Sequence, residues 1–192
     1  MVNSCSMKCL IWLVLVVLQT GCASLFEKPL AFDQQLDRRH LQQDRAWHFE
    51  GRLALSDAHE SIQAAINWNH QLEKDVIELT GPLGQGRLAI TVLAGLVVIE
   101  DGETRQEYQG DVDAVLSQQV AVAVPVRALK YWVLGVSDPG LVVANQENGF
   151  VQAGWAVQYK EMQWVKSLQL PKKMLAEKEV TKIKLIVDQW DI

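Results

Sequence analysis

The chain has 192 residues and a formal net charge of −5 at pH 7, and 49% of its residues are hydrophobic. This acidic balance argues against binding to nucleic acid, which demands dense positive charge, and against adhesion to anionic lipid head groups. The length suits one folded domain with a full hydrophobic core.

The first elements in chain order are those of a secretory signal. Lys8 is followed by an apolar stretch from Leu10 to Leu18 and by small residues before Cys22. This order predicts a signal peptide over residues 1–21 that is cleaved, and its apolar stretch is about half of the ~20 residues that span a bilayer. Cleavage removes 21 of the 192 residues and leaves 171; because one lysine and no acidic residue are lost, the net charge moves from −5 to −6. Cys22 is then the only cysteine, which excludes an internal disulfide and a cysteine metal cluster.

Cys22 follows the small pair Thr20-Gly21, and this arrangement resembles the lipobox of bacterial lipoproteins, although Gln19 stands where that motif usually has leucine. The resemblance implies that Cys22 is lipidated and becomes the first residue of the mature chain. The alternative is a plain secreted protein in which the cysteine is a chance feature. Attachment to a membrane would then come from acyl chains, each buried CH₂ contributing about 0.8 kcal/mol.

Residues 22–44 are predicted to form a lipidated N-terminal tether and a short helix, because a polar stretch with Pro29 precedes the charged run 33–44. From residue 45 to 192 the pattern changes to the two-residue alternation of half-buried strands, which marks the folded domain. Pro171 is expected to restrict its strand to an edge or an end of the sheet. Strands are predicted over residues 47–55, 62–68, 76–79, 88–93, 96–99, 104–109, 141–144, 150–153, 155–159, 167–170 and 180–187.

Helices are predicted in the middle of the chain. Asp111 can cap a helix that runs to Val120, and Pro125 suits the first turn of a second helix, Val126–Leu134, which Gly135 would end. Short strands separated by turns indicate an antiparallel meander. A sheet of about nine to eleven strands in one domain must curl or split.

The interior of such a curved sheet has two possible forms. Trp12 leaves with the signal, so six of the seven tryptophans remain in the mature chain. Together with the apolar strand faces they could line a hollow that helices cover. They could equally fill a solid core, which is the commoner arrangement, and the sequence alone leaves both open.

Motifs for catalysis and metal binding fail in detail. The stretch 81–88 is close to a phosphate-binding loop, but Arg87 stands where lysine is required and Leu88 where a hydroxyl is required. The stretch 59–63 lacks the second histidine of the zinc protease signature. The four histidines are isolated beside polar residues and are expected on exposed strands or loops. The sequence therefore predicts no catalytic residue, no metal site and no enzymatic activity.

Leu83 is a large aliphatic residue between Pro82 and Gly84, in what should be a tight loop. Turns favour Gly, Pro, Asn and Asp for backbone reasons, and leucine has no such reason to be there. It either folds back onto the core or projects into solvent. An exposed apolar tip would need a partner such as lipid or protein.

A series of short motifs extends over nearly the whole mature chain. In this order and spacing they resemble the LolB family of outer-membrane lipoprotein receptors, whose members receive lipoproteins from the soluble periplasmic carrier LolA and place them in the outer membrane. The motifs are the lipobox cysteine, Trp47-x-x-x-Gly51-Arg52, Trp68, Gly81-Pro82-Leu83-Gly84, Pro125-Val126-x-x-Leu129-x-x-Trp132-x-x-Gly135, Gly154-Trp155-x-x-x-Tyr159, Leu170-Pro171 and Trp190.

The resemblance implies a mainly β fold, an incomplete antiparallel β-barrel of about nine to eleven strands covered by two or three helices, with an apolar cavity for acyl chains. It places the family's protruding membrane-insertion leucine on Leu83, flanked by Pro82 and Gly84. Strand and helix residues that could point into the cavity are Trp47, Phe49, Leu53, Ile66, Trp68, Leu79, Leu88, Ile90, Leu129, Trp132 and Trp155.

The resemblance also implies a place and partners. Ala23 and Ser24 follow the cysteine where an inner-membrane retention signal would have Asp, so sorting to the outer membrane, with the domain facing the periplasm, is expected. The expected partners are a LolA-type carrier with its lipoprotein cargo and the lipid bilayer, and a monomer is expected. No cofactor is expected beyond the covalent lipid on Cys22. Two rivals remain: a generic periplasmic carrier of lipid or lipoglycan, and a periplasmic hydrolase.

Overall fold

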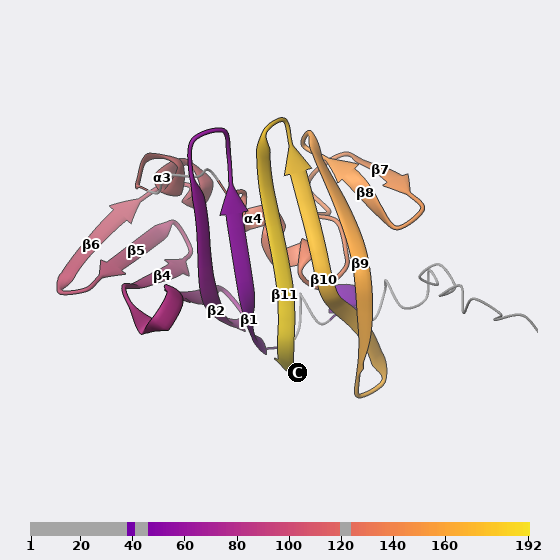
Figure 1. Cartoon of the computed structure of the whole chain (residues 1–192), viewed down its shortest axis with the longest axis horizontal. Helices are drawn as coiled ribbons and strands as arrows, with labels where there is room; N and C mark the ends of the chain where they lie inside the picture. The colour runs from indigo at the N-terminus through magenta and orange to yellow at the C-terminus, as the bar shows by residue number, and fades with distance from the viewer. Residues whose placement is uncertain (1–37, 41–45, 120–123) are drawn as a thin grey trace, which may run out of the picture.

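The computed structural model describes residues 38–40, 46–119 and 124–192, which hold one sheet of eleven antiparallel strands (Figure 1). The predicted signal peptide, residues 1–21, and the predicted lipidation residue Cys22 lie outside the described residues. The strands lie in the order β6-β5-β4-β3-β2-β1-β11-β10-β9-β8-β7, so β6 and β7 are the edges. Their bounds are β1 (Trp47–Ser56), β2 (Ser61–Gln71), β3 (Lys74–Thr80), β4 (Arg87–Leu93), β5 (Leu96–Asp101), β6 (Thr104–Gln109), β7 (Val143–Gln146), β8 (Gly149–Gln152), β9 (Trp155–Val165), β10 (Leu168–Lys178) and β11 (Thr181–Asp191).

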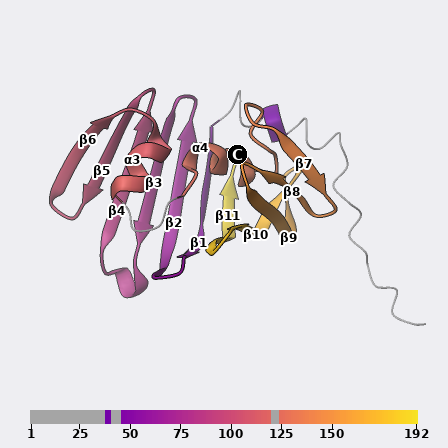
Figure 2. The same cartoon turned by 90° about the horizontal axis from the view of Figure 1, so that it is seen from above.

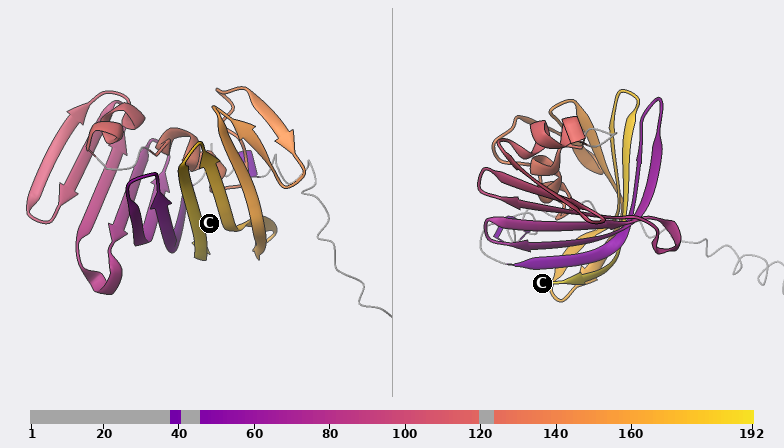
Figure 3. Two further views of the ribbon diagram at one scale, coloured as in Figure 1. Left: turned by 45° about the horizontal axis from the view of Figure 1, so that its top comes forward. Right: turned by 90° about the vertical axis from the view of Figure 1, so that its left-hand side faces the viewer.

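Two helices form a lid, α3 (Val112–Gln119) and α4 (Val126–Trp132), and a 3₁₀ turn, η1 (Pro82–Gly84), joins β3 to β4. The lid lies in the connection between β6 and β7, the two edge strands, so this part of the chain has to cross one face of the sheet. Figures 2 and 3 show the sheet curved, with the lid inside the curve. The predicted fold class, a mainly β, unclosed antiparallel barrel covered by helices, is confirmed.

Both lid helices begin where the sequence predicts, after Asp111 and at Val126. The second helix ends at Trp132, two residues before the predicted end. There the backbone tightens, since the N–H of Leu134 donates to the carbonyl of Tyr131 over 3.0 Å instead of one residue further back. Gly135 follows with φ of 82°, in the left-handed region that commonly closes a helix.

The strand β1 shows how the concave face is built. Its alternate residues are buried, and β1 pairs with β2 and with β11 along its length. At Glu50 and Gly51 the register skips Asp188 of β11, and this extra residue bends β11 against β1. A side chain at Gly51 would put its Cβ 2.2 Å from the carbonyl oxygen of Ile186, so only glycine fits this close approach.

Pro171 lies within β10, between β9 and β11, and not at the edge or end that the sequence predicts. The expectation was wrong because the ladder is irregular at this point. The register with β9 shifts on either side of Lys173, and pairing with β11 starts only at Lys173. The missing N–H of Pro171 therefore interrupts no bond to β11, while its carbonyl accepts from Trp190 Nε1 at 3.3 Å.

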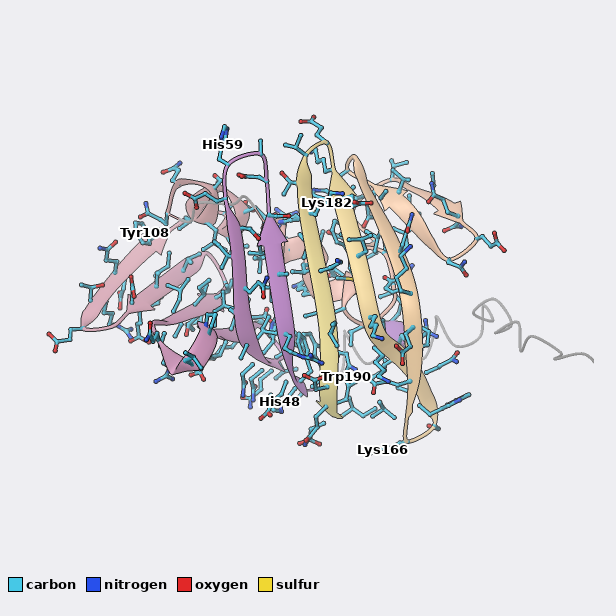
Figure 4. All side chains as sticks on the ribbon, viewed as in Figure 1. His48, His59, Tyr108, Lys166, Lys182 and Trp190 are labelled. Atoms are coloured by element: carbon cyan, nitrogen blue, oxygen red, sulfur yellow. The ribbon has the colours of Figure 1, made fainter. Side chains whose placement is uncertain are left out.

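An aromatic cluster, formed by Trp47, Phe49, Trp68, His70 and Trp190, fills one end of the concave face. Ring centroids lie 4.9 Å apart between Trp47 and His70 and 5.1 Å apart between Phe49 and Trp190. Figure 4 places Trp190 at the same end as His48 and Lys166, and His59 and Lys182 at the opposite end. The expectation that every histidine is exposed was wrong for His70, which is 1% exposed.

His70 is buried because a carboxylate meets it. Its Nδ1 lies 2.8 Å from Asp75 Oδ1, and Trp68 Nε1 donates to the same oxygen over 2.9 Å. Asp75 is 6% exposed, and buried polar groups are stable only when they are hydrogen-bonded. The alternation in β2 places Trp68 and His70 on one face, and the turn before β3 returns Asp75 to them.

None of the helices in the described part of the chain is long and apolar enough to cross a membrane.

Candidate functional site

A cavity of about 530 Å³ lies between the concave face of β1 to β6 and the lid. This volume is within the range of small-molecule binding sites. Its apolar walls come from strands, with Leu116, Val126 and Leu129 from the lid above them. The described residues that line it are Leu53, Leu55, Ile62, Gln63, Ala64, Ile66, Ile77, Leu79, Gly81, Gln85, Gly86, Arg87, Leu88, Ile90, Ile99, Asp101, Thr104, Gln106, Leu116, Gln119, Val124, Val126 and Leu129.

The walls change character along the strands. The deep residues are buried and apolar, among them Ile66, Ile77, Ile90 and Leu129, each 5% exposed or less. The polar lining residues are exposed and come from the β1–β2 and β3–β4 end of the sheet, from the β5–β6 hairpin and from the last residue of α3. We call this set the rim: Gln63, Gln85, Arg87, Asp101, Thr104, Gln106 and Gln119. The cavity is thus apolar inside and polar at its mouth.

The structure brings six of the eleven predicted cavity residues together around this cavity. These six are Leu53, Ile66, Leu79, Leu88, Ile90 and Leu129.

The five predicted aromatic residues do not line this cavity. Trp47, Phe49 and Trp68 pack in the aromatic cluster instead. Trp132 and Trp155 pack against each other, with centroids 6.1 Å apart, and Trp132 Nε1 donates to Gln152 Oε1 over 2.9 Å. A buried indole N–H usually has a polar partner, and for Trp132 the packed part of the core supplies it.

Several lining residues were missed by the sequence analysis. Leu55 continues the alternating face of β1, and Ile77 lies one alternation before Leu79 in β3. Ile99 faces Ile90 across the β4–β5 pair. The same two-residue period that predicted their neighbours could have found all three.

Asp111 fastens the two lid helices to each other. Its Oδ1 accepts the backbone N–H groups of Asp113 and Ala114, each at 3.1 Å, and thereby caps α3. Its Oδ2 accepts from Arg127 Nη1 of α4 at 2.8 Å. The hydrogen bond from Arg127, together with the backbone donors, lowers the pKa of Asp111. Asp113, which accepts the backbone N–H of Arg127, has a pKa raised mainly by burial.

We expect Asp111→Ala to destabilise the domain by about 1 kcal/mol at pH 7, the usual cost of a lost N-cap. A carboxylate whose pKa is lowered by folding stabilises the protein above its ordinary pKa, and that stability is lost as the pH falls through the lowered value. The difference between variant and wild type should therefore shrink below the ordinary value of 3.8. Urea unfolding at pH 7 and pH 3 measures it, and an equal difference at both pH values would contradict the capping role.

The short helical segment at residues 38–40 is attached to the chain directly after the lid. Arg38 is fully buried and donates to the carbonyl of Gly135 at 3.4 Å, and burial lowers its pKa. Arg39 donates to the carbonyl and to the hydroxyl of Ser137 at 3.3 and 3.2 Å. The segment that leads from the predicted tether into the domain is therefore held beside the C-terminal end of α4.

The loop of residues 81–86, which we call the Leu83 loop, stands at the rim. Leu83 is 98% exposed and adopts φ of 60°, so its side chain projects into solvent and not onto the core. The N–H of Gly81 donates to the carbonyl of Gly86 at 3.1 Å and closes the base of the loop. Gly81 must be glycine, because a Cβ there would lie 2.3 Å from the carbonyl oxygen of Gln85. The base of this loop lines the cavity while its tip carries an exposed leucine.

The described residues hold no group of three or more His, Cys, Asp or Glu side chains that could bind a metal ion. The buried His70–Asp75 pair lies in the aromatic cluster and does not line the cavity. The chemistry that the site offers is thus shielding of an apolar ligand by carbon walls, with hydrogen-bonding groups at the mouth.

Comparison with known proteins agrees with this geometry. The family model described as "Outer membrane lipoprotein LolB" matches residues 45–190. An outer-membrane lipoprotein LolB from Chromohalobacter salexigens is 32% identical over 95% of this chain and 90% of its own length, and one from Nitrosococcus oceani is 27% identical over 94% and 95%. Among solved structures, a LolA superfamily protein from Nitrosomonas europaea has a TM-score of 0.53 at 9% identity, covering 85% of this chain and 94% of that one, which shows likeness of fold alone.

Proposed function

Because the chain belongs to the LolB family of outer-membrane lipoproteins, we propose that it accepts lipoproteins from a LolA-type periplasmic carrier and inserts them into the outer membrane. The family gives the chain a role in lipoprotein localisation at the outer membrane, held there by lipid and facing the periplasm. It is a family of localisation factors and not one of known enzymes. The carrier, the cargo and the acyl-chain ligand are our proposal.

The observation that carries the proposal is the carbon-lined cavity with a polar mouth. A triacylated cargo has on the order of 40 methylenes, and at ~0.8 kcal/mol each their exposure to water would cost tens of kcal/mol. A shielding cavity lowers that barrier by about 0.8 kcal/mol for each methylene that it covers. Transfer without nucleotide or another cofactor then requires a downhill order of affinities, from carrier to this protein to bilayer.

The position of the Leu83 loop supports delivery to a membrane. Gly81, Gln85 and Gly86 line the cavity, and Leu83 projects from the same loop. Burying one leucine side chain in apolar surroundings gives about 1.5–3 kcal/mol. We propose that Leu83 enters the bilayer and holds the cavity mouth against it, so that an acyl chain moves from wall to lipid without crossing water.

The proposal is tested with the mature chain carrying Cys22→Ala, which lacks the proposed lipid. We expect this variant to be soluble and still to take cargo from a cargo-loaded carrier, because the cavity lies in the folded domain. Co-purification of labelled lipoprotein with the variant measures receipt, and free phospholipid vesicles in place of the loaded carrier serve as the comparison. Equal uptake of phospholipid would favour a generic lipid carrier, and an insoluble or inert variant would contradict a self-contained receptor.

A further inference from the structure

We propose that the cavity holds one acyl chain of about 16–18 carbons at a time, with the linkage of that chain emerging at the rim. The other chains of a multiply acylated cargo then stay outside the cavity. This inference rests on the proposed function and adds the capacity and the direction of the same site.

The volume of the cavity sets the capacity. A methylene is about as large as a water molecule, which occupies ~30 Å³. The cavity of about 530 Å³ therefore has room for roughly 18 methylenes. A cargo with on the order of 40 methylenes needs more than twice this volume.

The dimensions of the walls agree with one chain whose inner part lies across the strands and whose outer end turns toward the rim. The lining runs from Leu53 in β1 to Gln106 in β6, which is five spacings between neighbouring strands. At ~4.8 Å per spacing the path is about 24 Å long. One acyl chain in a bilayer takes about 15 Å, half of the ~30 Å hydrocarbon thickness. The cavity is long enough for one chain, and its volume of about 530 Å³ matches one chain better than two.

The cavity cannot grow toward β11, because packed side chains fill the rest of the concave face. The aromatic cluster closes one end, and Trp47, Phe49 and Trp68 are each 2% exposed or less. On the other side of the lid Trp132 is fully buried and meets Phe150 with centroids 6.3 Å apart. Interiors at this density yield little to an added group.

The polarity of the walls sets the direction. An ester or amide linkage deep in the cavity would meet Ile77, Ile90 and Leu116, none of which has a hydrogen-bonding side chain. Burial of such a group without a partner costs about 1–3 kcal/mol. At the rim the carboxylate of Asp101 and the amide of Gln106 are exposed and close to water. The methyl end of the chain therefore lies inside and the linkage lies outside.

The test uses the mature chain with Cys22→Ala and saturated lysophosphatidylcholines of 12 to 22 carbons below their micelle concentrations. Native mass spectrometry counts bound lipids, and competition with a fluorescent fatty acid ranks affinities. We expect one lipid per protein, with affinity rising about fourfold per methylene up to about 18 carbons and then levelling. Two lipids per protein, or a rise that continues to 22 carbons, would overturn the inference.

A matched pair of variants places the limit in this cavity. Ala64 lines the cavity, whereas Ala65 is exposed on the opposite face of β2. We expect Ala64→Phe to move the levelling point to chains shorter by roughly four carbons and Ala65→Phe to leave it unchanged. An unchanged limit in Ala64→Phe would also overturn the inference, and the wild-type limit remains a test should that variant not fold. Failure of every lipid to bind would instead contradict the proposed function itself.

Discussion

Leu83→Glu should accept cargo normally and fail to deliver it to membranes. The side chain of Leu83 is 98% exposed and does not line the cavity, so receipt and folding have no reason to change. Loss of about 2 kcal/mol of apolar burial lowers a membrane-engaged population about thirtyfold, and a carboxylate adds its own desolvation cost. Transfer of labelled lipoprotein from the loaded variant to phospholipid vesicles measures the effect.

The chain offers a close control for this variant. Leu72 is also an exposed leucine with a positive φ, at 74% exposed and 51°, but it lies in the β2–β3 turn at the other end of β3. Leu72→Glu should deliver cargo at the wild-type rate, and Leu83→Met should retain most of the activity because it keeps an apolar tip. Normal delivery by Leu83→Glu would remove the leucine from the mechanism, and equal loss in both glutamate variants would point to general repulsion from the membrane.

Asp75→Ala should lower the free energy of unfolding by about 2–6 kcal/mol, because it leaves two buried donors unsatisfied at about 1–3 kcal/mol each. The substitution leaves Trp68 Nε1 and His70 Nδ1 without their shared acceptor inside the aromatic cluster. Among the residues that the structure describes, none accepts a hydrogen bond from His70 Nε2 or Trp47 Nε1, so this part of the cluster has no spare acceptor to offer. Urea unfolding followed by tryptophan fluorescence measures the loss.

Two further variants separate this network from charge in general. Asp75→Asn keeps one acceptor oxygen and should lose less stability than Asp75→Ala. Asp188→Ala removes an exposed ion pair, in which Arg52 donates to Asp188 at 2.7 and 3.0 Å, and should cost less than about 1 kcal/mol. If Asp75→Ala costs no more than Asp188→Ala, the buried network does not hold this end of the sheet.

Much of the fold follows from local pattern. The two-residue alternation predicted β1 and β2, and the structure pairs the inward residues Phe49 and Trp68 of these strands. Asp111 and Pro125 marked the starts of the lid helices. These signals are local because a strand's period and a helix cap depend on neighbouring residues alone. The order within β1–β6 and within β7–β11 then follows from a meander in which sequential neighbours pair, whereas the pairing of β1 with β11 joins distant parts of the chain and no local signal predicts it.

The sequence could not predict which part of the concave face is filled by packed side chains and which part lines a cavity. A tryptophan at an inward position reads the same whether it packs into a solid region, as Trp47 and Trp132 do, or lines a hollow, as the aliphatic residues near Leu79 do. The outcome depends on which residues the lid brings down, and the lid is distant in sequence. Likewise Pro171 was misplaced because its tolerance depends on where β11 begins to pair, which no feature near the proline encodes.

The two open edges of the sheet, β6 and β7, bear on how readily the protein aggregates. A strand with unpaired backbone groups invites another copy to dock and extend the ladder into an aggregate. On β6 the exposed side chains of Arg105 and Glu107, with Glu103 in the turn before the strand, oppose this with charge, and Arg105 donates to Glu100 and Glu107 at 2.6 and 2.9 Å. On β7 brevity does the same, since it has only four residues. The sheet thus stays open around its cavity, while charge on β6 and the short length of β7 oppose pairing with another copy.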